Sequence, residues 1–67
     1  MLKDRLKKLR EDNNLKQNVI AKELNITSSC YNQYEKGKRE PSLEMIKKLC
    51  EFYNVSSDYL LDIKVDD

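Results

Sequence analysis

The sequence predicts an all-α fold, a compact bundle of five short helices. Three observations lead to this prediction. The 67 residues include a single glycine and a single proline, which leaves little material for the hairpin turns of a β fold. A chain of this length buries only about 60% of its unfolded surface, and it is too short for a sheet with crossover helices. Apolar residues recur at helical spacing, so we expect residues 1–67 to form one helical domain.

The first helix is expected at residues 2–12. Leu2, Leu6 and Leu9 recur at intervals of four and three residues and mark one face of a helix. Asn14 follows this stretch, and asparagine tolerates the left-handed conformation that ends a helix. We therefore expect the chain to turn there.

The second helix is expected at residues 17–24, with Ile20, Ala21 and Leu24 on its inward face. The small side chain of Ala21 allows another helix to approach closely. Asn25 stands where this helix must stop and is a suitable left-handed residue.

The third helix is expected at residues 28–35, with Thr27 as its N-cap and Gly37 ending it in the left-handed conformation. Side chains advance by about 100° per residue around a helix. Three of them fall toward the core: Cys30, Tyr31 and Tyr34. Four fall on the opposite, outward face: Ser28, Ser29, Asn32 and Gln33.

The outward face of the third helix has an unusual composition. It carries short hydroxyls and carboxamides, which donate and accept hydrogen bonds without charge. Base edges in the DNA major groove need such partners, because Asn and Gln can pair bidentately with adenine and Ser can meet several edges. Composition alone leaves an ordinary solvated face equally possible. The Gly37 stop and the cations that flank it, Lys36, Lys38 and Arg39, favour base reading.

A fourth helix is expected between Ser42, its N-cap, and Asn54, its left-handed stop. Its predicted inward face consists of Leu43, Ile46, Leu49, Cys50 and Tyr53. Ser56 then caps a last short helix at residues 57–61, with Leu60 as its core contact. Residues 62–67 form a tail.

The charge balance is nearly neutral, with 13 basic and 12 acidic residues. This total is weak support for a nucleic-acid partner. The basic residues, however, concentrate in the first ten positions and around Gly37, whereas acidic residues concentrate near the end. A neutral total can therefore hide one positive and one negative face.

Several classes of site are disfavoured by the composition. Cys30 and Cys50 are the only cysteines and there is no histidine, which argues against a zinc site and leaves no cofactor expected. The N-terminus lacks the apolar core of a secretory signal, so we expect reduced thiols in the cytoplasm. No apolar run approaches the roughly 20 residues that span a membrane. Without histidine, a glycine-rich phosphate loop or paired cleft carboxylates, an enzyme is not expected.

The chain resembles the phage repressor and Cro-like (Xre) helix-turn-helix family from about residue 6 to residue 61. The matching runs are RLKKLRE (5–11), LKQNVIAKEL (15–24), ITSSCYNQYEKGKREPSLEMIKKL (26–49) and VSSDYLL (55–61). The most specific of them contains YEKGKREPSLE. The resemblance implies a lambda-repressor-like helix-turn-helix domain, with the motif at residues 17–36. The second helix would then cross the DNA backbone and the third would lie in the major groove.

The resemblance also implies roles for particular residues. Base edges would be contacted by Thr27 at the rim, Ser28, Ser29, Asn32 and Gln33. Phosphates would be contacted by Gln17, Lys36, Lys38 and Arg39, with backbone N–H groups at the start of the second helix. A partly buried structural ion pair would join Arg10 to Glu35. The sequence departs from the family at Tyr31, where Ile or Val is usual, and at Lys16, where Ser or Thr usually caps the second helix.

These observations together predict a sequence-specific transcriptional regulator of double-stranded DNA, a repressor acting as a homodimer on a pseudo-palindromic operator. Within 67 residues there is no room for a separate oligomerisation domain. The candidate dimer contacts therefore lie in the last helices and the tail: Phe52, Ser57, Tyr59, Leu61, Ile63 and Val65. The alternative is an antitoxin or other protein-interaction module, which binds a partner protein and also regulates its own operon.

Overall fold

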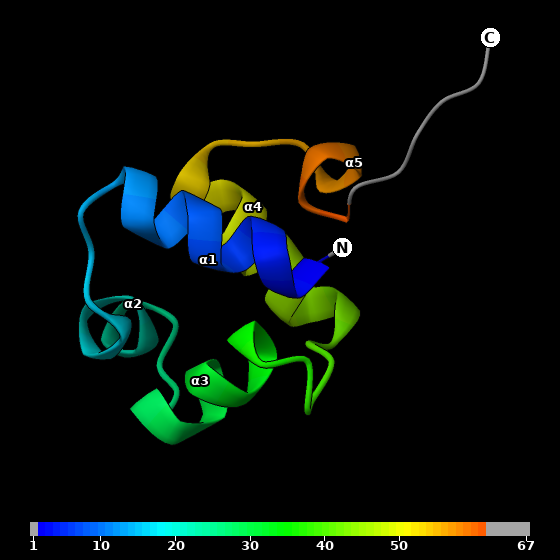
Figure 1. The fold of residues 1–67 in the computed structure, drawn as a ribbon. Coiled ribbons are helices and arrows are strands. Elements are labelled where there is room, and N and C mark those ends of the chain that lie inside the picture. The colour runs from blue at the N-terminus through cyan, green and yellow to red at the C-terminus, as the bar shows by residue number, and fades with distance from the viewer. Residues whose placement is uncertain (1, 62–67) are drawn as a thin grey trace, which may run out of the picture.

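A computed structural model describes residues 2–61 of the protein, and within them the chain forms helices and no strands. The five helices are α1 (Leu2–Asp12), α2 (Gln17–Glu23), α3 (Ser28–Glu35), α4 (Leu43–Tyr53) and α5 (Ser57–Leu60) (Figure 1). The predicted all-α bundle is confirmed. Helices α2 and α5 each end one residue earlier than predicted, because Leu24 and Leu61 are their C-cap residues. The tail predicted at 62–67 lies outside the described residues.

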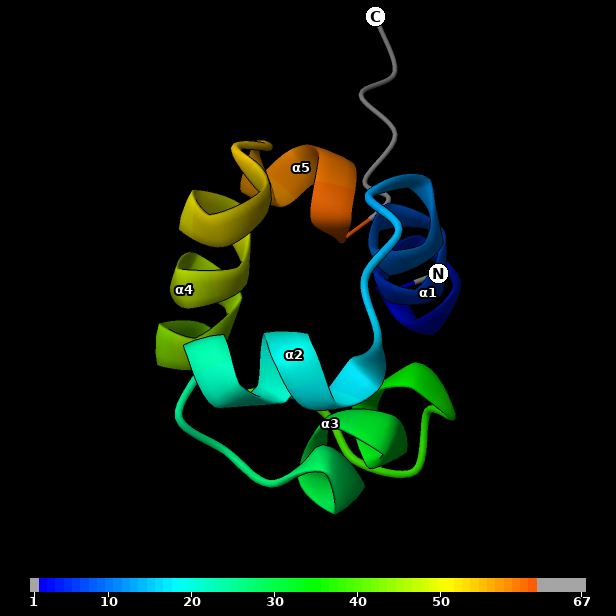
Figure 2. The same cartoon turned by 90° about the vertical axis from the view of Figure 1, so that its left-hand side faces the viewer.

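The helices are arranged around one core. Helix α1 packs against α3 and α5, while α2 packs against α3, and α4 packs against α5. Turning the molecule shows α1 and α4 on opposite sides, with α2 crossing between them (Figure 2). Helix α3 lies at one end of the bundle and α5 at the other in both views (Figures 1 and 2). One side of α3 therefore packs on the bundle while its other side faces solvent.

The core collects the apolar faces that the helical spacing predicts. Its buried residues are Leu6, Leu9, Ile20, Ala21, Leu24, Tyr31, Tyr34, Leu49 and Leu60. Cys30, Cys50 and Tyr53 are half-buried and pack against this cluster. Tyr31 is the largest of the fully buried side chains, so the core accommodates a tyrosine where the family usually has a smaller aliphatic residue.

The prediction that Leu43 belongs to the inward face of α4 is wrong, since Leu43 is 72% exposed. Leu43 is the first residue of α4, and helical side chains lean toward the N-terminus of their helix. Its side chain therefore projects past the end of the helix and away from the core. Met45 packs against the core instead, and Pro41, just before the helix, is buried.

The left-handed stops predicted for the helices are confirmed. Asn14, Asn25, Gly37 and Asn54 have φ angles of 57°, 60°, 72° and 56°. After each stop, the next N–H group donates to a carbonyl five residues back. These hydrogen bonds are Leu15 to Arg10 (3.0 Å), Ile26 to Ala21 (2.9 Å), Lys38 to Gln33 (3.0 Å) and Val55 to Cys50 (3.0 Å). This is the Schellman pattern, so the end of each of these helices is specified locally.

The helix starts are capped less evenly. The hydroxyl oxygens of Thr27, Ser42 and Ser56 accept from backbone N–H groups three residues on, at 3.0, 3.1 and 3.1 Å. Lys16, at the start of α2, makes no such cap. Helix α3 is thus capped at both ends, by Thr27 and by Gly37. Its rotation about its own axis, and hence the direction of its outward residues, is set by the buried side chains of Tyr31 and Tyr34.

Candidate nucleic-acid interface

The outward face of α3 consists of the residues that the spacing places there. Ser28 and Ser29 are exposed, and Asn32 and Gln33 are half-buried. Tyr31 and Tyr34 on the opposite side are 0% and 6% exposed. Thr27, at the rim, is exposed, but its hydroxyl oxygen already accepts the Cys30 N–H as the helix cap. It retains its own O–H as a donor.

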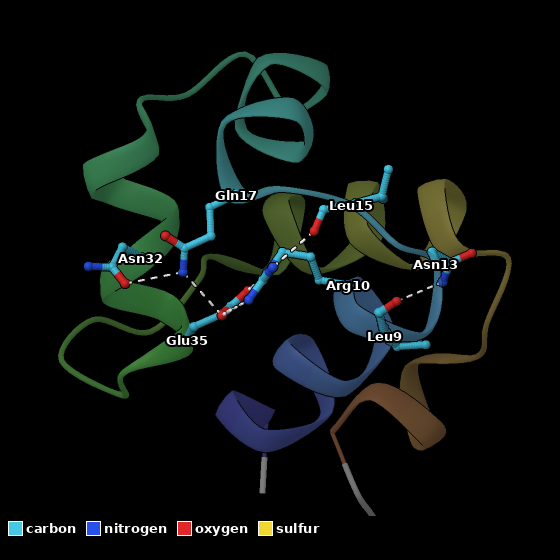
Figure 3. A network of polar contacts seen from close by, with 7 residues as sticks. All are labelled: Leu9, Arg10, Asn13, Leu15, Gln17, Asn32 and Glu35. Atoms are coloured by element: carbon cyan, nitrogen blue, oxygen red, sulfur yellow. Dashed lines mark hydrogen bonds and ion pairs between the residues drawn. The ribbon is translucent and has the colours of Figure 1, made fainter.

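Arg10 and Glu35 form a bidentate ion pair between α1 and the last residue of α3 (Figure 3). Arg10 Nε donates to Glu35 Oε2 at 2.6 Å, and Nη2 donates to Oε1 at 3.2 Å. Nη1 donates to the carbonyl of Leu15 at 2.9 Å. The two charged side chains are only 15% and 5% exposed. Arg10 is therefore committed to the inside of the protein and is not a free cation.

Electrostatic effects keep this pair charged. Burial alone would raise the pKa of Glu35, but the Arg10 guanidinium, the Tyr31 hydroxyl and the Gln17 amide together outweigh burial and lower it. The hydrogen bond to Glu35 raises the pKa of Arg10, against the opposing effect of burial. At neutral pH, Glu35 is therefore a carboxylate, which can accept hydrogen bonds but cannot donate them.

Gln17 connects this ion pair to the outward face of α3 (Figure 3). Its Nε2 group donates to Glu35 Oε1 and to Asn32 Oδ1, each at 3.2 Å. Because the Glu35 carboxylate only accepts, it determines which way the Gln17 amide faces. The Gln17 amide in turn requires the oxygen of Asn32. The Nδ2 group of Asn32 consequently points away from Gln17, outward from the bundle (Figure 3).

This network bears on the phosphate contact that the family resemblance implies for Gln17. Both N–H groups of its amide are used inside the protein, so its side chain has no N–H left to donate to a phosphate. Any phosphate contact at this position would have to be made by the backbone N–H. Sequence reasoning did not identify Gln17 as a partner of Asn32, because the two are 15 residues apart and meet only through the packing of α2 on α3.

The cations after α3 lie on the same exposed stretch of chain. Lys36, Lys38 and Arg39 are all exposed. Lys3 of α1 joins them, since a Cβ added at Gly37 would lie 2.9 Å from Lys3 Cδ. From the sequence, Lys3 could be recognised only as one of the basic residues in the first ten positions. Its proximity to Gly37 depends on how α1 packs against the end of α3.

The candidate dimer contacts lie on α4 and α5. Phe52 and Tyr59 are each 37% exposed; Ser57 is exposed and Leu61 half-buried. The Phe52 ring meets Tyr53 edge-on, with centroids 5.0 Å apart, and the Arg5 guanidinium lies 4.5 Å from the Tyr59 ring centroid. Ile63 and Val65 lie outside the described residues. Helix α5 is at the opposite end of the bundle from α3 (Figure 1), so contacts there leave α3 uncovered.

Within residues 2–61, no group of three or more potential ligands could hold a metal ion. No helix in the described part of the chain is both long and apolar enough to cross a membrane. Cys30 and Cys50 are free thiols.

Comparison with known proteins decides the family. The helix-turn-helix family model HTH_3 matches residues 6–60. The chain belongs to the Xre/Cro-like helix-turn-helix family. Helices α2 and α3 both lie within the matched residues.

Helix-turn-helix relatives include prophage and phage regulators. The SPbeta prophage-derived transcriptional regulator YonR of Bacillus subtilis is 43% identical over 61 residues, which cover 91% of this chain and 56% of YonR. The CTXphi transcriptional repressor RstR of Vibrio cholerae is 34% identical, over 82% of this chain and 50% of RstR. The chain thus spans about half the length of these relatives.

A solved structure has the same fold. A transcriptional regulator from Listeria innocua superposes with a TM-score of 0.93 over 100% of this chain and 63% of that protein, at 24% sequence identity. At this identity, the likeness concerns the fold alone. It agrees with the five-helix arrangement described above.

Proposed function

We propose that the protein is a sequence-specific transcriptional regulator of double-stranded DNA, a homodimeric repressor that works in the cytoplasm with α3 in the major groove. The observation that carries this proposal is the uncharged polar face of α3, held outward by the Gln17–Glu35–Arg10 network in a chain of the helix-turn-helix family. RstR, which is a transcriptional repressor, supports repression as the direction of control.

In this proposal, α3 reads base edges through Ser28, Ser29, Asn32 and Gln33, with Thr27 at the rim. The orientation of Asn32 makes a specific contribution. Since its Oδ1 accepts from Gln17, Asn32 offers N–H donors to the DNA and is not free for bidentate pairing with adenine. It suits an acceptor at a base edge, such as a purine N7, guanine O6 or thymine O4. Gln33 is then the residue that pairs bidentately with adenine.

Phosphates are contacted on either side of α3. The backbone N–H of Gln17 contacts a phosphate on one side of the half-site. The cations Lys36, Lys38 and Arg39 contact phosphates on its other side, with Lys3 next to them. Such contacts release condensed counterions, so affinity should fall steeply with salt. They position the protein on the duplex without carrying sequence information.

Homodimerisation through the ends of α4 and α5 gives the operator its symmetry. Phe52, Ser57, Tyr59 and Leu61 are the described candidates, and Ile63 and Val65 are the candidates beyond them. A two-fold dimer of this motif places two recognition helices about one helical turn, roughly 34 Å, apart. The proposed operator is therefore a pseudo-palindrome with half-sites at that spacing.

Selection from a pool of random DNA duplexes, followed by sequencing of the bound fraction, tests the proposed function. The expected result is a two-fold motif with half-sites about one helical turn apart. Placing that motif upstream of a reporter gene should reduce its expression. A motif without symmetry would contradict the homodimer, and increased expression would contradict repression. No enrichment at moderate salt would contradict base reading and favour the protein-interaction module.

Base and phosphate contacts should respond differently to substitution. Asn32→Ala and Gln33→Ala should each weaken binding to the selected operator by about 1–3 kcal/mol and change binding to random duplex little. Lys38→Ala should weaken binding to both and reduce the slope of log affinity against log salt by about one unit. Titration by fluorescence anisotropy at several salt concentrations measures both quantities.

The matched control for Lys38→Ala is Lys8→Ala, which removes the same charge from the outer face of α1, where Lys8 pairs with Asp12 at 3.1 Å. It should leave the salt slope unchanged. Equal losses on operator and random duplex from the α3 substitutions would rule out base reading by Asn32 and Gln33.

A further inference from the structure

Two amide side chains joined by one hydrogen bond can be arranged in two ways. Either amide can donate an N–H to the oxygen of the other, because each carries donors and an acceptor. Gln17, the first residue of α2, and Asn32 on α3 form such a pair, with Gln17 Nε2 and Asn32 Oδ1 3.2 Å apart. Taken alone, this pair would not determine which end of the Asn32 amide faces away from the bundle.

The Glu35 carboxylate removes one of the two arrangements. Gln17 Nε2 also donates to Glu35 Oε1 at 3.2 Å, and Glu35 cannot turn away, because Arg10 holds both of its carboxylate oxygens at 2.6 and 3.2 Å. A reversed Gln17 amide would place its oxygen against a group that only accepts hydrogen bonds. It would also lose a hydrogen bond to a charged group, so the observed arrangement is favoured roughly tenfold to a hundredfold.

We propose that position 17 determines the base preference of α3 without contacting a base, because its side chain decides whether Asn32 offers donors or an acceptor to the DNA. This inference rests on the proposed function for base reading by Asn32. With glutamine at position 17, the Nδ2 group of Asn32 faces outward (Figure 3). Among the exocyclic groups of the major groove, it matches the keto oxygens guanine O6 and thymine O4.

An acceptor at position 17 should reverse this preference. It would draw the Nδ2 group of Asn32 inward and leave Oδ1 outward, which matches the amino groups adenine N6 and cytosine N4. Gln17→Glu introduces such an acceptor with nearly the same shape. An ionised carboxyl group there only accepts hydrogen bonds, and a protonated one donates its single O–H to the charged Glu35 carboxylate, the stronger acceptor. In both protonation states, Asn32 Oδ1 loses its donor and turns outward.

The reversal is tested by titrating operator variants with the protein. The position that Asn32 reads is the one at which Asn32→Ala loses base preference. At that position, the keto preference is the affinity with guanine or thymine divided by the affinity with adenine or cytosine. Gln17→Glu should lower it about threefold to tenfold relative to wild type, the effect of one hydrogen bond.

Gln17→Met is the second variant, because it removes the hydrogen bonds without placing a carboxyl group beside Glu35. It should also lower the keto preference, since the freed Asn32 amide can turn either end to the DNA. Circular dichroism verifies that each variant is folded. An unchanged keto preference in both variants would overturn the proposal.

Two controls separate the position of Asn32 from the added charge. Asn18→Asp adds the same charge at the next residue of α2, which is exposed. It should weaken binding to all duplexes alike and leave the keto preference unchanged. In an Asn32→Ala background, Gln17→Glu should not change the base preference at this position, because the side chain that it positions is absent. A shift of the same size in either control would rule out action through Asn32.

The orientation of the two amides is tested in the free protein, by NMR of side-chain hydrogen exchange. In the wild type, both N–H groups of Gln17 are hydrogen-bonded inside the protein, so they should exchange more slowly than those of Asn32 and Gln33. In Gln17→Glu, exchange of the Asn32 N–H groups should become slower, because one of them now donates inward. Equal rates for Gln17 and Gln33 in the wild type would show that the Gln17 amide is not held.

The two proposals fail in distinguishable ways. A wild-type chain that does not discriminate between DNA sequences would contradict the proposed function, and the exchange rates would still decide whether Gln17 orients Asn32. Slow exchange at Gln17, together with a keto preference that neither substitution at position 17 changes, would overturn the role of that position in specificity alone.

Discussion

Replacing Arg10 with alanine should destabilise the protein by about 3–5 kcal/mol, the usual effect of removing one partner from a buried ion pair. Glu35, with a side chain that is 5% exposed, would then lack its bidentate partner, and the Leu15 carbonyl would lose a donor. Such a loss is a large part of the folding free energy of a small domain. Urea denaturation followed by circular dichroism at neutral pH measures it.

Lys8→Ala is the matched control for Arg10→Ala, because Lys8 also pairs with a carboxylate but its pair is exposed, with side chains 59% and 57% accessible. An exposed pair of this spacing contributes only about 0.3–0.5 kcal/mol. The two substitutions should therefore differ several-fold in their effect. Similar small losses from both would show that the Arg10–Glu35 pair contributes little to stability.

Acidification provides a second measurement on the same pair. The pKa of Glu35 is lower in the folded protein than its ordinary value of 4.5. Its contribution to stability is therefore complete above that ordinary value and is lost as the pH falls through the lower, folded value. In Arg10→Ala, Glu35 has already lost its main partner. The difference in stability between wild type and variant should thus be largest at neutral pH and should shrink as the pH falls below 4.5.

Leu49→Ala should destabilise the protein by about 2–5 kcal/mol, whereas Leu43→Ala in the same helix should change stability by less than about 0.5 kcal/mol. Leu49 is 0% exposed and Leu43 is 72% exposed, so only the first substitution leaves a cavity. The two variants remove the same atoms from α4 and are controls for each other in thermal or urea denaturation. A comparable loss from both would contradict the observed orientation of Leu43.

Leu43 also illustrates where sequence reasoning reaches its limit. Helix boundaries could be predicted because their signals are local: a Ser or Thr cap at the start, and an asparagine or glycine in the left-handed conformation at the end. The outward face of α3 could be predicted because it depends on the angle between residues of one helix. A helical pattern alone, however, does not show how far the core extends, so it could not tell that the first turn of α4 lies beyond it.

Contacts between helices were the least predictable. The Arg10–Glu35 pair was expected from the family resemblance, since nothing in the spacing indicates a contact between residues 25 apart. The contacts of Gln17 with Asn32 and Glu35 span 15 and 18 residues and depend on how α2 crosses α3. The proximity of Lys3 to Gly37 depends on the packing of α1 in the same way. Such contacts follow from three-dimensional packing that no local pattern encodes.

Some side chains on the outward face of α3 are hydrogen-bonded to other helices and others are not, and this difference affects how the protein can evolve. Ser28 and Ser29 are exposed, so they can be exchanged for other polar residues with small effects on stability. Asn32 accepts a hydrogen bond from a network that reaches α1, so a change there also disturbs the packing of three helices. If α3 reads base edges as proposed, new operator preferences are therefore easier to acquire at the first turn of α3 than at its second, and related proteins can diverge in their DNA targets while keeping one core.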